Sequence, residues 1–211
     1  MAKAASTAVA SRLIIGGQVC VSPKRIIVTD AVADEFTARF TEAFGNQKLG
    51  DPFDPETTVG PLSSHAAVDI LQAQLQDAVD KGATVLVPGG RVEGPGAFFQ
   101  PAVITDITPQ MRVYSEEAFG PLAMIYRVPD TDTAVAFANS SEYGLGGTVF
   151  GEVDEARRVA GQLDAGGVGI NKFLGAPVVI PFGGTKRSGV GRELGRSGMD
   201  QFANIKTYSA D

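Results

Sequence analysis

Residues 122–150 read LAMIYRVPDTDTAVAFANSSEYGLGGTVF, and this stretch decides the fold class. Six of its first seven residues are uncharged and mostly large and apolar, which predicts a buried strand over Leu122–Val128. A helix is expected to begin near Asp130, and Gly147–Phe150 is a second strand candidate. A strand, a helix and a further strand in this order are typical of a βαβ unit with parallel strands.

The same alternation extends in both directions along the chain. Further strand candidates are short apolar runs between turn signals, namely Arg25–Val28, Thr84–Val87, Ala102–Ile104 and Gly166–Ile170. Further helices are expected over residues 3–14, after Asp30 as N-cap, after Ser63 or Ser64 as N-cap, and near Glu152. The prediction is an α/β fold with a mainly parallel sheet flanked by helices.

Two of the expected helices carry apolar side chains at helical spacing. These residues are Phe36, Phe40 and Phe44 in the helix after Asp30, and Val68, Leu71, Leu75 and Val79 in the helix that Gly82 ends. Such stripes predict the faces that pack on the sheet.

Composition and charge exclude several classes of protein. The net charge of −6 offers no basic excess for nucleic acid or anionic membranes, so neither is an expected partner. A single cysteine among 211 residues cannot form an internal disulfide, which favours a reducing, cytoplasmic setting. No apolar run approaches the ~18 residues of a membrane span, and the N-terminus has no signal-peptide core.

Self-contained cofactor and metal motifs are also absent from the sequence. The 26 glycines include no G-x-G-x-x-G motif, because Gly189-Val-Gly191 is followed by Arg-Glu-Leu. They include no P-loop motif either, because Gly183-Gly-Thr-Lys-Arg-Ser lacks the G-K-[ST] ending. One cysteine and one histidine cannot supply a clustered metal site. His65 is expected to lie exposed near a helix start, and without another histidine a serine-based triad has no base.

Cys20 is the one candidate nucleophile of unusual context. It follows Gly16-Gly17-Gln18-Val19, where backbone N–H groups or nearby cations could favour the thiolate. The alternative is a buried structural cysteine, which is the commoner role of a free thiol.

The motifs around and after this cysteine resemble those of aldehyde dehydrogenases. In chain order they are Gly17-Gln18-Val19-Cys20, Leu49-Gly50-Asp51-Pro52, Gly60-Pro61, Glu116-Glu117-Ala118-Phe119-Gly120-Pro121, Asn139 with Tyr143-Gly144-Leu145, and Pro181-Phe182-Gly183-Gly184 followed by Lys186 to Glu193. They cover nearly the whole chain in the order of that family. The resemblance places a catalytic domain at residues 1–199 and an oligomerisation strand at residues 200–211, around Phe202–Tyr208.

The resemblance also implies roles for individual residues. Cys20 matches the nucleophile that attacks an aldehyde to give a thiohemiacetal, and its own backbone N–H would help hold the oxyanion. Glu117 matches the glutamate that binds the nicotinamide ribose, and Phe119 the aromatic beside the nicotinamide ring of NAD or NADP. Phe182 matches a residue that lines the aldehyde tunnel. For each of the last three, an ordinary surface or core role is the alternative, and Asn171 is expected to do no more than hold the Pro181–Gly191 loop.

Other parts of the family pattern are not found in the 211 residues. The nucleotide-binding domain, the glutamate base and a side-chain amide of the oxyanion site lie upstream of the cysteine in family members. The expectation is therefore a chain truncated at its N-terminus, inactive by itself, and forming a homo-oligomer through exposed apolar surface. Ile15 stands where many members carry asparagine, and the sequence assigns no consequence to it.

Two functional hypotheses follow. The first is oxidation of a small aldehyde to its acid within a longer enzyme, with succinate semialdehyde suggested by residues 143–150 and 181–189. Lys24 or Arg25 would then be a candidate for meeting a substrate carboxylate, or simply a surface charge. The second is a non-catalytic binding or assembly module that keeps the fold.

Overall fold

Strand β6 (Leu122–Val128) lies inside a four-stranded sheet with the order β1-β6-β5-β2. It pairs in parallel with β1 (Arg25–Thr29) and with β5 (Ala102–Thr105), whereas β2 (Thr84–Val87) pairs antiparallel with β5. Six of the seven residues of β6 are buried, as expected for a strand covered on both faces. The predicted, mainly parallel sheet is confirmed in this computed structural model, which describes residues 1–175 and 177–211.

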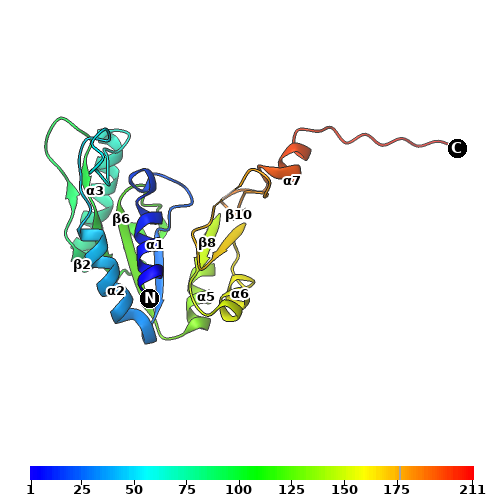
Figure 1. Ribbon diagram of the computed structural model, residues 1–211. Coiled ribbons are helices and arrows are strands. Elements are labelled where there is room, and N and C mark those ends of the chain that lie inside the picture. Colours follow the sequence, from blue (N-terminus) through cyan, green and yellow to red (C-terminus); the bar gives the residue numbers. More distant parts are fainter. Residues whose placement is uncertain (176) are drawn as a thin grey trace. The chain divides into compact units, whose positions relative to one another are not determined.

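Both faces of the sheet are covered by helices, because side chains along β6 alternate between two cores. Ala123 and Ile125 belong to the core under α1 (Ala2–Arg12) and α2 (Asp30–Gly45), which Figure 1 shows beside the sheet. Leu122, Met124 and Tyr126 face the opposite core. That core is closed by helices α3 (His65–Asp80), α4 (Arg112–Ser115) and α5 (Thr131–Asn139).

The aromatic stripe of α2 packs as the sequence predicts. Phe40 and Phe44 are fully buried and Phe36 nearly so, and successive rings stack with centroids 5.7 and 5.2 Å apart. Full burial of such a side chain contributes about 1.5–3 kcal/mol. The predicted cap is wrong by one residue, because α2 begins at Asp30 and Thr29 is its N-cap. The Asp30 carboxylate instead accepts a hydrogen bond from Arg127 at 2.6 Å.

The stripe of α3 is confirmed in part. Ser64 is the N-cap, and its hydroxyl accepts the N–H of Ala67 at 3.1 Å. Val68, Leu71 and Leu75 are buried, but Val79 is exposed, since the buried row continues through Ala78. Gln74 is buried within this row without being apolar, because its amide donates to the 116–117 segment described below.

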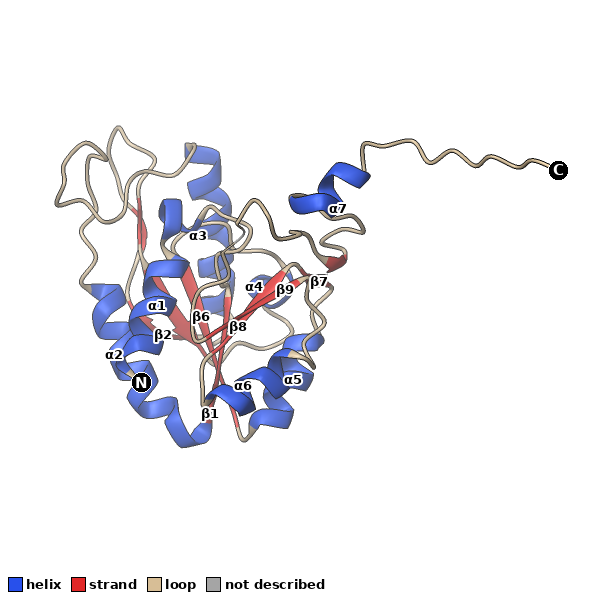
Figure 2. Ribbon diagram, turned by 45° about the vertical axis from the view of Figure 1, so that its right-hand side comes forward, coloured by secondary structure: helices blue, strands red, loops and turns tan. Residues whose placement is uncertain are grey.

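Residues Met1–Ser140 form one compact unit and Ser141–Asp211 a second, each described by itself. In the second unit, β8 (Gly146–Val149) and β9 (Gly167–Ile170) pair in parallel and are joined through α6 (Val153–Ala160). Glu152 caps α6 through bonds from Asp154 N and Glu155 N. The strands predicted near 147–150 and 166–170 and the helix near Glu152 are therefore confirmed; Figure 2 shows these elements in colour by type.

Several short elements had no sequence signal. They are the 3₁₀ turn η1 (Ile14–Gly17), strands β3 (Gly90–Arg91) and β4 (Phe99–Gln100), strands β7 (Tyr143–Gly144) and β10 (Thr185–Lys186), and helix α7 (Gly195–Asp200). Residues 201–211, all of them described, form no strand within the chain. The expected strand at Phe202–Tyr208 needs a partner chain, so it stays a prediction, as does the boundary expected between residues 199 and 200.

Candidate active site

Two loops of the first unit meet at one end of the sheet. The cysteine loop (residues 13–24) leads into β1, and the acidic loop (residues 116–121) leads into β6. Because β1 and β6 are adjacent parallel strands, the loops that precede them lie at the same edge. This topology brings Cys20 to the neighbourhood of Glu117 and Phe119, almost 100 residues later in the chain.

Arg12 fastens the two loops together from inside. Its side chain is fully buried and donates to Gly17 O (3.3 Å) and Ser22 Oγ (3.0 Å) of the cysteine loop. The same guanidinium also donates to three carbonyls of the acidic loop and the start of β6, those of Ala118 (2.8 Å), Gly120 and Leu122 (3.0 Å). Burial lowers the pKa of Arg12 to about 9, which leaves it charged at neutral pH.

Gly17 marks the closest approach of the loops. It has φ +79°, and a Cβ built there would lie 2.5 Å from the carbonyl oxygen of Gly120. A side chain at this position is therefore excluded by both backbone conformation and space. The requirement explains why a glycine precedes Gln18 in the cysteine motif.

Gln18 holds the outer side of the cysteine loop. Its Nε2 donates to Ile15 O at 3.0 Å, and its Oε1 accepts the N–H of Ser63 at 2.8 Å. The second bond links the cysteine loop to the loop that contains Gly60-Pro61. The side-chain amide thus uses both its donor and its acceptor to fix the turn before Cys20.

Cys20 itself is a free, exposed cysteine. The alternative of a buried structural cysteine is therefore not what the structure shows. An exposed thiol at the end of a loop held on both sides can reach a reagent from solvent.

Lys24 contacts Glu117, Phe119 and the backbone of Cys20, so these three residues lie around one side chain. The Lys24 ammonium lies 2.7 Å from Glu117 Oε1 and 5.5 Å from the centre of the Phe119 ring. The same nitrogen donates to Cys20 O at 3.0 Å. The Glu117 side chain is 43% exposed, and Phe119 is 44% exposed.

The two adjacent glutamates of the acidic loop have different environments. Glu116 receives two-pronged hydrogen bonds from Arg112 at 2.9–3.1 Å and a bond from Gln74 at 3.1 Å. The Arg112 bonds lower the pKa of Glu116 below its ordinary value. Glu116 therefore anchors the loop to α3 and α4, whereas Glu117, equally exposed, is paired through one oxygen with Lys24.

The open groups fit a nicotinamide nucleoside. Among the described residues, Glu117 Oε2 has no hydrogen-bond partner, so it can accept from a ribose hydroxyl. The exposed face of Phe119 offers an apolar plane for a flat ring. Both features are those expected of Glu117 and Phe119 from the sequence, although their contact with NAD or NADP stays a prediction.

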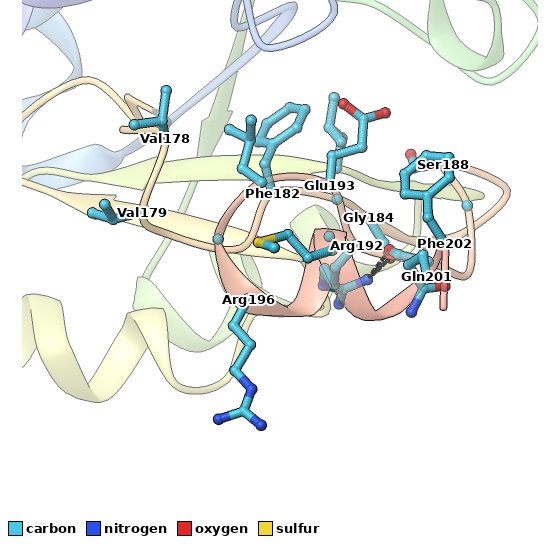
Figure 3. A pocket seen from close by; sticks show the side chains of 18 residues that line it. Val178, Val179, Phe182, Gly184, Ser188, Arg192, Glu193, Arg196, Gln201 and Phe202 are labelled. Carbon is cyan, nitrogen blue, oxygen red and sulfur yellow. Dashed lines mark hydrogen bonds between the residues drawn. The ribbon is translucent and has the colours of Figure 1, made fainter. Parts of the chain in front are cut away.

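Phe182 lies in the second unit. Its N–H donates to Glu193 O at 2.8 Å and its carbonyl accepts from Glu193 N at 2.6 Å, so the loop 183–192 closes on itself. Figure 3 shows Phe182 on the wall of an open hollow of about 900 Å³, in which Arg192 donates to Gly184 O at 2.7 Å. Phe182 is part-exposed there, and its role in lining an aldehyde tunnel stays a prediction.

Asn171 has a structural role, but at another place than the sequence predicts. It has φ +53° and exchanges two hydrogen bonds with the backbone of Gly151, at 3.0 and 2.9 Å, so these bonds hold the turn at Gly151 and not the 181–191 loop. His65 is exposed as the first residue of α3.

The sequence did not predict that Arg12, Gln18 and Lys24 hold the loops of the site. The available signal for Arg12 was a cation at the end of a helix of mostly small side chains, AKAASTAVASR, whose other cation, Lys3, lies at the opposite end. Within the described part of the chain, no helix is long and apolar enough to cross a membrane, and no three acidic, histidine or cysteine side chains are placed to hold a metal.

Comparison with known proteins shows the family of this chain. The profile of the aldehyde dehydrogenase family matches residues 1–208. A succinate-semialdehyde dehydrogenase [NADP(+)] of Deinococcus radiodurans is 54% identical over 99% of this chain and 43% of its own length. The NAD(P)+ succinate semialdehyde dehydrogenase Sad of Escherichia coli K12 is 39% identical over 99% of this chain and 45% of its own length.

Solved structures show the same relationship. The succinic semialdehyde dehydrogenase of Streptococcus pyogenes in complex with NADP+ is 39% identical, with a TM-score of 0.94 over 99% of this chain and 46% of that one. A betaine aldehyde dehydrogenase of Staphylococcus aureus in complex with NAD+ is 35% identical, with a TM-score of 0.90 over 95% of this chain and 41% of that one. The chain spans less than half the length of these relatives. It belongs to the aldehyde dehydrogenase family.

Proposed function

We propose that this chain carries the thiol nucleophile, Cys20, of an NAD(P)-dependent enzyme that oxidises an aldehyde to its carboxylic acid. The observation that carries the proposal is an exposed thiol on a loop that Arg12 fastens to the loop of Glu117 and Phe119. A binding module would not need these three groups gathered at one edge of the sheet. Membership of the family supports the same conclusion.

The chemistry proposed for Cys20 begins with attack of its sulfur on the aldehyde carbon. A C–S bond forms, and the carbonyl electron pair moves to the oxygen, whose charge the backbone N–H of Cys20 is proposed to stabilise. A bound nicotinamide supplies the acceptor for the hydride that leaves this carbon. Cys20 then holds a thioester, which water cleaves to the acid and the free thiol.

Glu117 and Phe119 are proposed to orient the cofactor. A carboxylate accepts hydrogen bonds from both hydroxyls of a ribose, and the Glu117 side chain is 43% exposed with only its Oε1 paired among the described residues. The Phe119 ring would limit the freedom of the nicotinamide at the same edge. Relatives are named for NADP+ and for NAD(P)+, so the proposal includes both cofactors.

Succinate semialdehyde is the substrate we propose, because three of the four relatives reported above are named for it, and these three are more similar in sequence than the betaine aldehyde dehydrogenase. Lys24 and Arg25 are poor candidates for binding its carboxylate. Lys24 is paired with Glu117, and Arg25 donates to Phe137 O (2.8 Å) and Ala138 O (3.3 Å) while its guanidinium lies 4.0 Å from the centre of the Phe137 ring. Neither cation is free at the surface. A reactive thiol also favours a reducing compartment, and the cytoplasm is the proposed location.

Alkylation of the 211-residue chain with iodoacetamide at pH 7 tests the role of Cys20. A rate well above that of free cysteine is expected if the loop activates the thiol. A rate no higher than that of free cysteine would contradict the proposed nucleophile and favour the binding module. Cys20→Ser removes the only thiol and gives the background.

A second measurement is reduction of NAD or NADP with succinate semialdehyde. The 211 residues alone are expected to give none, since family members take their base and nucleotide domain from sequence upstream of the cysteine. Cofactor reduction by the purified chain would show this part of the proposal to be wrong.

A further inference from the structure

Lys24 is the last residue of the cysteine loop, and its backbone is fixed at the sheet. Its carbonyl accepts the N–H of Met124 in β6 at 3.4 Å, next to the point where β1 begins. The side chain is only 14% exposed. A lysine so placed has little freedom to turn toward solvent.

The Lys24 ammonium uses all three of its donor positions. It donates to Val19 O and to Cys20 O, each at 3.0 Å, and to Glu117 Oε1 at 2.7 Å. Two of these acceptors are the backbone of the thiol-bearing residue and of its predecessor. The third is the carboxylate proposed to receive the ribose.

Among the described residues, Glu117 is the only anionic side chain paired with the Lys24 ammonium. Burial lowers the pKa of Lys24, and its interaction with the Glu117 carboxylate opposes that shift. The Arg12 guanidinium also lowers the pKa of Lys24, whereas the Cys20 side chain raises it. The Cys20 thiol therefore lies within the electrostatic field of the Lys24 ammonium. Removing one partner of such a pair leaves the other charge uncompensated.

We propose that Lys24 is a positioning residue of the reaction proposed above: one ammonium holds the backbone of Cys20 and the side chain of Glu117 at a common point. Its bond to Glu117 Oε1 turns Oε2 outward for a ribose hydroxyl. Its bonds to the two carbonyls fix the direction from which the thiol leaves the loop, and its charge lies 3.0 Å from the carbonyl oxygen of the thiol-bearing residue. The inference rests on the proposed role of Cys20.

Alkylation by two reagents of different charge tests the inference on the 211-residue chain. Iodoacetamide is neutral and iodoacetate is an anion of similar size, so the ratio of their rates reports the field at the thiol. This ratio cancels changes in thiol exposure, which affect both reagents alike. A purely structural role for Lys24 would leave it unchanged.

Lys24→Met keeps the aliphatic stem and removes the charge. We expect the iodoacetamide rate to fall about threefold or more, and the iodoacetate-to-iodoacetamide ratio to fall by a similar factor. Lys24→Arg restores a cation and should return both quantities to within about twofold of the unchanged chain. Lys48→Met is the matched control, because Lys48 is 52% exposed and pairs only at the surface with Asp54 and Glu56.

Glu117→Gln is the second variant, and it should fold because Glu117 is 43% exposed. Loss of its negative charge with Lys24 in place should raise the ratio about twofold. If Lys24→Met does not fold, this variant and Lys24→Arg decide the question. An unchanged ratio in Glu117→Gln, or rates in folded Lys24→Met equal to those of Lys48→Met, would overturn the inference. Slow alkylation of the unchanged chain would instead sink the proposed function.

Discussion

Replacing Ile15 by asparagine is expected to stabilise the protein. Ile15 has φ +49° and ψ +43°, the left-handed region, and a β-branched residue is rarely found there. The turn is held in place by its neighbours, since Gln18 N (3.2 Å) and Gln18 Nε2 (3.0 Å) both donate to Ile15 O. The strain is therefore imposed on Ile15 by the loop that leads to Cys20.

The gain follows from two opposing contributions. The left-handed conformation costs about 1–2 kcal/mol for an L-residue, and asparagine tolerates it best among non-glycine residues. The side chain is 72% exposed, so roughly a quarter of the ~1.5–3 kcal/mol for full burial is lost with it. The net stabilisation is about 0.5–1.5 kcal/mol, or a rise in Tm of about 1–6 °C for a chain of this size.

Urea unfolding followed by far-UV circular dichroism measures this gain. Ile70→Asn is the matched control, because Ile70 is 58% exposed and lies in α3 with negative φ. We expect that control to lose a few tenths of a kcal/mol through helix propensity. Equal midpoints for Ile15→Asn and Ile70→Asn would refute the strain argument.

Three further changes are predicted from the contacts of the site and of the C-terminal unit. Arg12→Met should cost about 3–5 kcal/mol in urea unfolding, because it leaves several buried carbonyls without a donor. Glu116→Gln should cost about 0.5–1 kcal/mol at pH 7 after screening by water, and the cost should vanish as pH falls below ~4.5, since a carboxylate with a lowered pKa stabilises only while ionised. Phe202→Lys with Ile205→Lys should reduce self-association in sedimentation velocity, because both side chains are almost fully exposed and apolar; unchanged association would contradict the expected homo-oligomer.

The sheet and its helices were predictable because their signals are local. Leu122–Val128 is apolar over consecutive residues, and the phenylalanines of α2 recur every four residues, so each can be recognised without knowledge of its partner. The burial of Gln74 was not predictable in this way, because it depends on a distant segment of the chain. Gln74 took a buried place because acceptors near residues 116 and 117 were available, and no spacing within α3 reveals that.

The sequence predicted which residues belong to the candidate site, but it did not predict how these residues contact one another. Cys20, Glu117 and Phe119 came from motifs, and the parallel pairing of β1 with β6 brings their loops together. The role of Lys24 depends on an atom 93 residues away in the chain, which no local pattern contains. Ile15 likewise became intelligible only once its backbone conformation was known.

The loops that carry the site have few strand or helix partners, so their carbonyls need other donors. Arg12 supplies donors to Gly17, Ala118 and Gly120, and Lys24 supplies them to Val19 and Cys20. Both cations reach in from the ends of regular elements, α1 and β1, whose own positions the core fixes. Arg12 and Lys24 thus connect the geometry around the thiol to the packed sheet. Each of these two side chains can be shortened or neutralised by substitution without altering a group proposed to react.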